Sequence, residues 1–172
     1  LYNASSFQLA LDIIKNNNFA GLINGPISKK YFLKKNLPGI TEYIAKKTNT
    51  QKFAMLIYNK KLAVSPITTH IPINKVSKLI SKKKIIHHVK LINSFYKKNF
   101  NQIPRIAITG LNPHCENNLK NNEEKKIIIP AIRYLKKRSL KIKGPLSADS
   151  LFMRENIKKF DVVIGMYHDQ VL

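Results

Sequence analysis

Three histidines of this 172-residue chain follow apolar, strand-like runs and could together bind a metal ion. Each of His70, His114 and His168 lies in a turn within a few residues of such a run. Loops at the carboxyl ends of strands open into the binding crevice of α/β proteins. Imidazole is a common ligand of Zn²⁺ and Co²⁺, and a three-histidine site leaves coordination positions open for substrate. The histidines are 44 and 54 positions apart, so no local zinc motif exists and three isolated histidines are the alternative.

Two carboxylates stand near these histidines and have candidate catalytic roles. Asp169 follows His168 directly, and Asp149 lies in the turn after Gly144-Pro145. Either could orient a metal-binding histidine or accept a proton. For Asp149, an ordinary helix N-cap is an equally good interpretation. Cys115 stands beside His114, but the spacing specifies no general base for it, so we favour a small residue without nucleophilic function.

Composition limits the other function classes. Lysine and arginine number 31 against 9 acidic residues, a net charge of +22 that attracts anions such as nucleic acid or a phosphorylated metabolite. The lysines are scattered along the chain, and the best aromatic and basic cluster is only Phe95-Tyr96-Lys97-Lys98. A solvated lysine-rich surface is therefore favoured over a nucleic-acid-binding domain. A single cysteine, with no apolar run long enough for a membrane span and no signal peptide, predicts a cytoplasmic protein.

The elements that must position these residues alternate between strands and helices, which predicts an α/β fold. We predict helices over 7–14, 29–37, 42–47, 74–80, 81–100, 123–137 and a turn at 148–152, and strands over 19–24, 53–58, 61–67, 103–109 and 161–166. A hairpin at Asn59-Lys60 would make the sheet mixed. Pro130 should kink its helix, and we expect His87-His88 to lie on a solvated helix face. No internal domain boundary is predicted within residues 1–172.

Six motifs occur in the order found in the 4-hydroxythreonine-4-phosphate dehydrogenase family, which this sequence resembles over nearly all of its length. They are Asn24-Gly25-Pro26-Ile27-Ser28-Lys29, Pro38-Gly39-Ile40-Thr41-Glu42, Thr68-Thr69-His70-Ile71-Pro72, Gly110-Leu111-Asn112-Pro113-His114, Gly144-Pro145-Leu146-Ser147-Ala148-Asp149 and Met166-Tyr167-His168-Asp169-Gln170. The resemblance implies a mixed sheet flanked by helices, similar to isocitrate and isopropylmalate dehydrogenases. It also implies that this chain is a central piece of a longer enzyme, incomplete at both ends.

The reaction implied by the resemblance is an NAD- or NADP-linked oxidation in pyridoxal phosphate (vitamin B6) biosynthesis. The family oxidises 4-phosphooxy-L-threonine to a β-keto acid, which loses CO₂ to give 3-amino-2-oxopropyl phosphate. Its metal-ligand histidines fall on His70, His114 and His168, with Zn, Mg or Co as the expected divalent ion. One ligand comes from the partner subunit, so a homodimer with a shared metal site is implied. Cofactor binding in the family does not use a Rossmann glycine fingerprint, and none occurs here.

The sequence departs from the family pattern at two places. Ile40 stands where the family has a substrate-binding histidine, while Thr41 retains the neighbouring substrate contact. Residues 115–118 replace a glycine-rich continuation. The family's later substrate contacts and most of its amino-terminal domain lie outside this chain, so we expect little or no turnover from these residues alone. A paralogue that oxidises another phosphorylated four-carbon hydroxy acid is the alternative within the same enzyme class.

Overall fold

The computed structural model describes residues 2–16, 19–28, 32–33, 37, 39–115 and 122–172. It divides into two compact units, Leu1–Lys52 and Phe53–Leu172. The sequence predicts no boundary here, because residues 48–53 contain no proline, glycine or change of charge that would mark one. Each unit is described by itself.

The first unit contains helices α1 (Tyr2–Asn16) and α3 (Ile40–Lys47). The Phe7 ring lies 5.2 Å from the Phe32 ring and 5.6 Å from the Tyr43 ring, centroid to centroid. The helix predicted at the start of the chain is confirmed. The strand predicted over 19–24 is wrong: this segment is irregular, and no strand in the described part of the unit pairs with it. Most of the helix predicted over 29–37 lies outside the described residues.

The second unit is built on a four-stranded sheet in the order β1-β4-β2-β3. The strands are β1 (Ala63–Thr68), β2 (Ile106–Thr109), β3 (Ile142–Leu146) and β4 (Val162–Tyr167), and every neighbouring pair is parallel. The α/β class is therefore confirmed. The predicted hairpin is reduced to one antiparallel bridge between Ile57 and Val64. Strand β3 was not predicted, because Gly144-Pro145 interrupts its apolar pattern.

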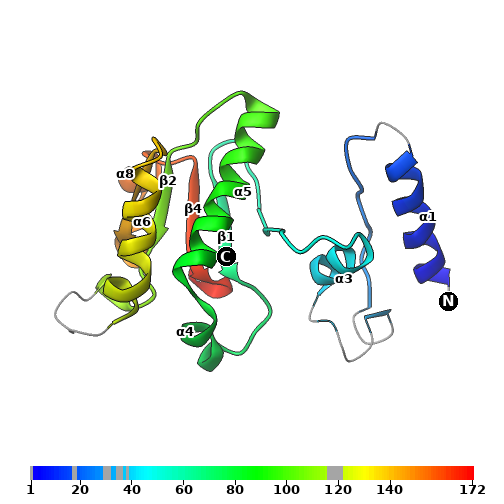
Figure 1. Cartoon of the computed structure of the whole chain (residues 1–172), viewed down its shortest axis with the longest axis horizontal. Helices are drawn as coiled ribbons and strands as arrows, with labels where there is room; N and C mark the ends of the chain where they lie inside the picture. The colour runs from blue at the N-terminus through cyan, green and yellow to red at the C-terminus, as the bar shows by residue number, and fades with distance from the viewer. Residues whose placement is uncertain (1, 17–18, 29–31, 34–36, 38, 116–121) are drawn as a thin grey trace. The chain divides into compact units, whose positions relative to one another are not determined.

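Helices cover both faces of this sheet. They are α4 (Val76–Leu79), α5 (Lys82–Phe100), α6 (Ile129–Lys136), α7 (Ala148–Leu151) and α8 (Arg154–Ile157). In Figure 1, α5 and α6 lie side by side over the near face, and α8 lies behind the sheet. The Ser81 side chain caps α5 by accepting a hydrogen bond from Lys84 N at 3.2 Å. None of the helices in the described ranges is long and apolar enough to cross a membrane.

The segment before α6 differs from the predicted single helix over 123–137. Residues Glu124–Ile128 form a π-helical turn, η3, which leads directly into α6. Pro130 stands in the first turn of α6, where a missing backbone N–H costs little. The irregularity expected from Pro130 is thus present, but it takes the form of the π turn before it. Such turns are frequent at functional sites.

Alternate residues of the central strand β4 face the two sides of the sheet. Val162, Ile164 and Met166 pack in the core beneath α5 and α6, whereas Val163 packs on the other face with Leu151. All of these side chains are at most 2 % exposed. Burial on both faces is typical of a parallel sheet between helix layers. Because the strands are parallel, their carboxyl ends share one edge, and the loops after β1, β2 and β4 lie there.

His88 corrects the prediction of a solvated face at His87-His88. The His88 side chain is only 5 % exposed and lies 2.7 Å from Ser65 Oγ through Nε2. Because the Ser65 hydroxyl donates to the Met55 carbonyl, its oxygen accepts from the imidazole. Burial, assisted by the charges of Lys84 and His87, lowers the pKa of His88 to about 4. His88 is therefore a neutral core residue that joins α5 to β1.

Candidate functional site

The carboxyl edge of the sheet carries the three predicted histidines. His70 follows β1 by two residues, His114 lies in the 3-10 turn η2 (Pro113–Cys115) after β2, and His168 begins the 3-10 turn η4 (His168–Gln170) directly after β4. The placement of all three in turns after strands is as the apolar pattern predicts. Their mutual distances decide which of them could share a ligand.

His70 and His168 are brought together. Strands β1 and β4 are hydrogen-bonded neighbours, and the two imidazole centroids lie 6.0 Å apart with the rings tilted by 39°. A hollow of about 60 Å³ lies beside them between the ends of the two strands, with His168 and Asp169 in its lining. Of the three predicted ligands, these two lie near each other within one chain.

The spacing of the pair can be compared with the geometry of a shared metal ion. A Zn–N bond of about 2.1 Å places an ion about 3.2 Å from each ring centroid, so the centroids can be at most about 6.4 Å apart. The observed 6.0 Å lies within that limit. A tetrahedral angle at the ion would draw the centroids to about 5.2 Å. The separation of the two rings is therefore compatible with a common divalent ion.

Asp169 has the geometry of a residue that orients His168. Its Oδ1 lies 2.7 Å from His168 Nδ1. A carboxylate on Nδ1 fixes the ring and leaves Nε2 available as a metal ligand. The alternatives for Asp169 were an orienting role and a proton-accepting role, and this contact supports the first.

His114 lies apart from the other two histidines and faces Asp149. Its side chain is 73 % exposed, and its Nδ1 lies 3.7 Å from Asp149 Oδ2, beyond hydrogen-bond distance. Asp149 is in the first turn of α7 and is not its N-cap, because Ser147 holds that position. The N-cap interpretation of Asp149 is therefore wrong.

Within the described ranges, no three histidine, cysteine, aspartate or glutamate side chains lie close enough together to hold a metal ion. A single chain thus unites two of the three predicted ligands. The three-histidine metal site remains a prediction. Thr41, the predicted substrate-binding residue, lies in α3 of the first unit.

Glu124 is a site residue that the sequence did not reveal. Its side chain is fully buried, and Oε1 accepts hydrogen bonds from Leu111 N at 2.8 Å and Asn112 N at 2.9 Å. Oε2 accepts from Asn112 Nδ2 at 2.9 Å. One carboxylate therefore fixes the backbone that leads to His114. The sequence shows only an acidic residue at a helix start, which a favourable helix dipole explains equally well.

Gly110 leaves room for this carboxylate. A Cβ at Gly110 would lie 2.6 Å from Cys115 Sγ and 3.0 Å from Glu124 Oε1. Cys115 is buried, and burial raises the pKa of its thiol, which agrees with the sequence-based interpretation of a small residue without nucleophilic function. The loop is thus closed over Glu124, with His114 on its outer side.

Gln170 is a second unpredicted site residue, and it ties the ends of β2 and β4 together. Its Oε1 accepts from Met166 N and from Thr109 Oγ1, both at 2.8 Å. Its Nε2 donates to the Gly110 carbonyl at 2.7 Å. The Gln170 side chain therefore joins the loop that carries His168 to the loop that carries His114.

The backbone at two of the three histidines is in a costly conformation. His114 has φ 57° and His70 has φ 26°, and Cys115 follows His114 with φ 53°. Positive φ is uncommon for residues with a side chain, and it concentrates at functional sites where surrounding structure maintains it. At the β2 loop, the surrounding structure is the set of hydrogen bonds to Glu124.

Comparison with known proteins places the whole chain in one family. The family model for the pyridoxal phosphate biosynthetic protein PdxA matches residues 1–172. A 4-hydroxythreonine-4-phosphate dehydrogenase of Sulfurihydrogenibium sp. (strain YO3AOP1) is 44 % identical over 155 residues, covering 88 % of this chain and 48 % of the relative. A D-threonate 4-phosphate dehydrogenase of Pectobacterium atrosepticum is 35 % identical over 134 residues, covering 77 % of this chain and 41 % of the relative.

Solved structures agree with the sequence matches. The crystal structure of 4-hydroxythreonine-4-phosphate dehydrogenase from Klebsiella pneumoniae superposes with a TM-score of 0.73 at 34 % identity, covering 85 % of this chain and 46 % of that one. The chain spans about half the length of the curated relatives it matches. With a family model that covers every residue, the chain belongs to the family of the pyridoxal phosphate biosynthetic protein PdxA.

Proposed function

We propose that the protein to which this chain belongs is a metal-dependent dehydrogenase that oxidises the secondary alcohol of a phosphorylated hydroxy acid with NAD or NADP. The proposed substrate is 4-phosphooxy-L-threonine, in pyridoxal phosphate biosynthesis. The observation that carries the proposal is the approach of His70 and His168 to 6.0 Å at the carboxyl edge of a parallel sheet. Family membership and the names of the relatives support the reaction class.

The residues of this chain have separable roles in that reaction. His70 and His168 would hold a divalent cation, and Asp169 would keep the His168 ring turned with Nε2 outward. When bound, the cation supplies positive charge beside which a substrate hydroxyl loses its proton more readily. Asp149, whose side chain is 69 % exposed, is placed to accept a proton or to orient His114.

The third ligand is proposed to come from a second copy of the chain. His70 and His168 meet within one chain, whereas His114 lies elsewhere on the same edge. A two-fold symmetric dimer repeats the same surface on both subunits, so it can unite ligands that one subunit keeps apart. We therefore propose a homodimer in which both subunits contribute histidines to each metal site.

No residue of this chain is assigned to the nicotinamide cofactor. The sequence contains no G-x-G-x-x-G fingerprint for a dinucleotide. When bound, the cofactor supplies the hydride acceptor. This chain contributes to the chemistry through the carboxyl edge of the sheet that carries His70, His114 and His168, which we call the histidine edge.

A second substrate is favoured by a specific observation. The matched relatives include a D-threonate 4-phosphate dehydrogenase, and Ile40 replaces a histidine that the family resemblance assigns to substrate binding. Loss of an imidazole donor changes which polar group of a substrate can be held. D-threonate 4-phosphate is therefore the alternative substrate.

Metal binding tests the proposal. Zn²⁺ titrated into the purified chain should bind, and His168→Ala or His70→Ala should weaken the affinity by more than about tenfold. The matched control is His87→Ala, a half-buried histidine of α5 that does not line the hollow beside His168, and it should change the affinity by less than about twofold. Equal effects in all three variants would show that the histidine edge is not the metal site.

Dimerisation and substrate choice can be measured on the same sample. Metal affinity should increase with protein concentration in parallel with the dimer fraction seen by sedimentation. Equal metal affinity in monomer and dimer would refute ligands from two subunits. Calorimetric titration with each phosphorylated acid, with Zn²⁺ and then with EDTA, identifies the preferred substrate. Metal-independent binding of both acids would contradict the proposed role of the ion.

A further inference from the structure

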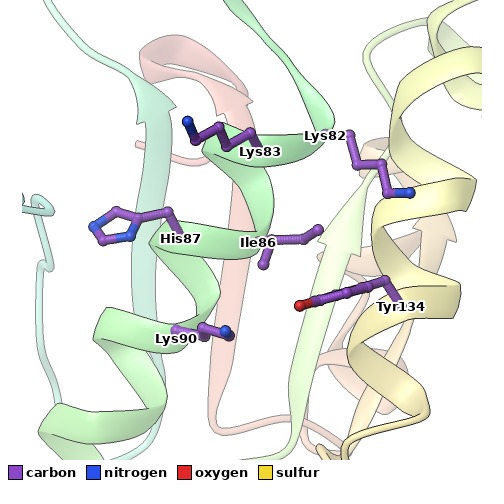
Figure 2. A pocket seen from close by; sticks show the side chains of 6 residues that line it. All are labelled: Lys82, Lys83, Ile86, His87, Lys90 and Tyr134. Carbon is purple, nitrogen blue, oxygen red and sulfur yellow. The ribbon is translucent and has the colours of Figure 1, made fainter.

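A basic groove lies between α5 and α6, on the helix layer that covers the sheet (Figure 2). It is a hollow of about 430 Å³, lined by Lys82, Lys83, Ile86, His87 and Lys90 of α5 and by Tyr134 of α6. We call it the α5–α6 groove. Its volume falls in the range of about 300–1,000 Å³ that holds small molecules in proteins. None of its lining residues belongs to the histidine edge.

Three cations surround the Tyr134 ring. Lys82 Nζ and Lys90 Nζ each lie 5.9 Å from the ring centroid, and Arg138 Cζ lies 3.7 Å from it. Figure 2 shows the ring reaching from α6 toward Ile86, with Lys82 and Lys90 extending from α5 toward it. A single neutral ring gives each cation only a weak cation–π contact at an exposed site. An anion placed among them would be a much stronger partner.

The groove contains no acidic side chain to balance these charges. Its lining is lysine, histidine, tyrosine and isoleucine, and none of the ion pairs found among the described residues involves a lysine of α5. The first turn of α5 has no acidic residue, although Lys82, Lys83 and Lys84 stand at its positive dipole end. Like charges therefore accumulate where the helix already disfavours cations. The charge of Lys84 also contributes to the low pKa of His88.

His87 adds an unpartnered polar atom to the wall of the groove. Its Nε2 is buried, and the described residues provide no hydrogen-bond partner for it. Figure 2 shows His87 on the same flank of α5 as Lys83. Buried polar atoms are normally paired, so this nitrogen is available to a polar partner in the groove.

We propose that the α5–α6 groove binds a small anion that carries at least two phosphoryl groups. Lys82 and Lys90 are eight residues apart, a rise of about 12 Å along the helix, yet both ammonium groups converge on one ring. A single phosphoryl group makes contacts of about 2.8 Å, so it suits one ammonium group and its immediate neighbours. A diphosphate can contact both ammonium groups at once. The proposal is independent of the proposed dehydrogenase function.

The test is calorimetric titration of inorganic pyrophosphate into the purified chain in EDTA at low ionic strength. The unaltered chain should bind one equivalent saturably. The double variant Lys82→Gln/Lys90→Gln should weaken the affinity at least about tenfold, because it removes two charge-assisted contacts. The matched control, Lys97→Gln/Lys98→Gln, removes the same charge from exposed lysines in the last turn of α5 and should weaken it less than about twofold.

Three outcomes would overturn the proposal. Equal weakening in both double variants would show general attraction to a basic chain. Saturable binding that His168→Ala or His114→Ala removes would place the anion at the histidine edge. Absence of saturable binding by the unaltered chain would show that the groove is a solvated lysine face. Far-ultraviolet circular dichroism of each variant checks that the helices remain folded.

Discussion

The two ends of the parallel sheet are built in different ways. At the amino end, Arg105 and Asp161 precede β2 and β4 and satisfy each other: Asp161 Oδ2 accepts from Arg105 N at 2.7 Å, and Oδ1 accepts from Arg105 Nη2 at 2.8 Å. At the carboxyl end, His70 and His114 stand in positive-φ turns. The polar groups of the amino end form an ion pair with one another, whereas the carboxyl end carries histidines in the turns that follow the strands. The first arrangement serves stability, and the second is suited to a ligand.

The carboxyl end has its own internal pairing, but it lies beneath the histidines. Glu124 holds the backbone before His114, and Gln170 links the loops after β2 and β4. The sheet thus uses buried polar side chains at this end to fix the loops that carry the histidines. Positioning residues of this kind allow outward-facing groups to hold a defined geometry.

The largest expected effect comes from removing the buried carboxylate. Glu124→Leu leaves Leu111 N and Asn112 N without their acceptor inside the fold, and it removes the shorter of the two hydrogen bonds that Asn112 Nδ2 donates. We expect a loss of about 3–5 kcal/mol in the free energy of unfolding, measured by urea denaturation. The neighbouring control Glu123→Leu removes one hydrogen bond of 3.3 Å and should cost less than about 1 kcal/mol. Similar losses in the two variants would show that Glu124 does not hold the loop.

A smaller loss is expected at the link between the two loops. Gln170→Leu removes the three hydrogen bonds of 2.7–2.8 Å that Gln170 makes with Met166 N, Thr109 Oγ1 and the Gly110 carbonyl. Thr109 Oγ1 then keeps only its 3.5 Å hydrogen bond to the Ile164 carbonyl. We expect about 2–3 kcal/mol less stability, again by urea denaturation. Gln102→Leu changes the same residue type at an exposed position and should alter stability by less than about 0.5 kcal/mol. If Gln170→Leu did not change the stability, the ends of β2 and β4 would not depend on the Gln170 side chain.

The contrast between the two ends explains what the sequence could and could not predict. The apolar runs before His114 and His168 are local patterns, so the sequence predicts that both residues follow strands. The helix predicted to begin at Ser81 is likewise a local signal, and it is confirmed. Glu124 could not be recognised, because its partners are backbone amides 12 and 13 residues away, and backbone groups leave no signature in sequence.

The approach of His70 to His168 could not be predicted from the sequence either. It depends on β4 pairing with β1 and β2 on its two sides, and strand order follows from packing and not from local pattern. The strand predicted over 19–24 failed for the same reason, because an apolar run becomes a strand only when a partner strand is present. Strand β3 shows the converse, since pairing with β2 overrides a poor local signal at Gly144-Pro145.

The two aspartates at the carboxyl end differ in how closely each approaches its histidine. Asp169 lies 2.7 Å from His168 Nδ1, whereas Asp149 lies 3.7 Å from His114 Nδ1 with both side chains largely exposed. Asp169→Asn should weaken Zn²⁺ affinity about tenfold, the lower range for loss of a residue that orients a metal-binding histidine. Asp149→Asn should weaken it less than about threefold. Calorimetric titration of Zn²⁺ measures both, and the reverse order of effects would assign the orienting role to Asp149.

The smallest effect is expected at the amino end, and it depends on pH. Burial raises the pKa of Asp161, but the hydrogen bonds from Arg105 and the charges of Arg105 and Lys141 outweigh it, so the pKa is lowered from 3.8. The folded state therefore binds this proton less readily than the unfolded chain does. The stabilisation is present above pH 3.8 and is lost as pH falls through the lower folded pKa.

Asp161→Asn should remove this acid-side dependence. We expect a cost of about 1 kcal/mol at neutral pH, because the Arg105 side chain is half exposed and solvent screens the pair, and a smaller cost below about pH 3. His88 protonates at higher pH: its pKa of about 4 lies below its ordinary 6.5, so its destabilising effect grows as pH falls between these values. Both proteins share that change, so subtracting the urea-derived stabilities of variant and unaltered chain isolates Asp161. A difference that stays constant from pH 7 to pH 2.5 would show that the Arg105–Asp161 pair stabilises the sheet through packing and not through charge.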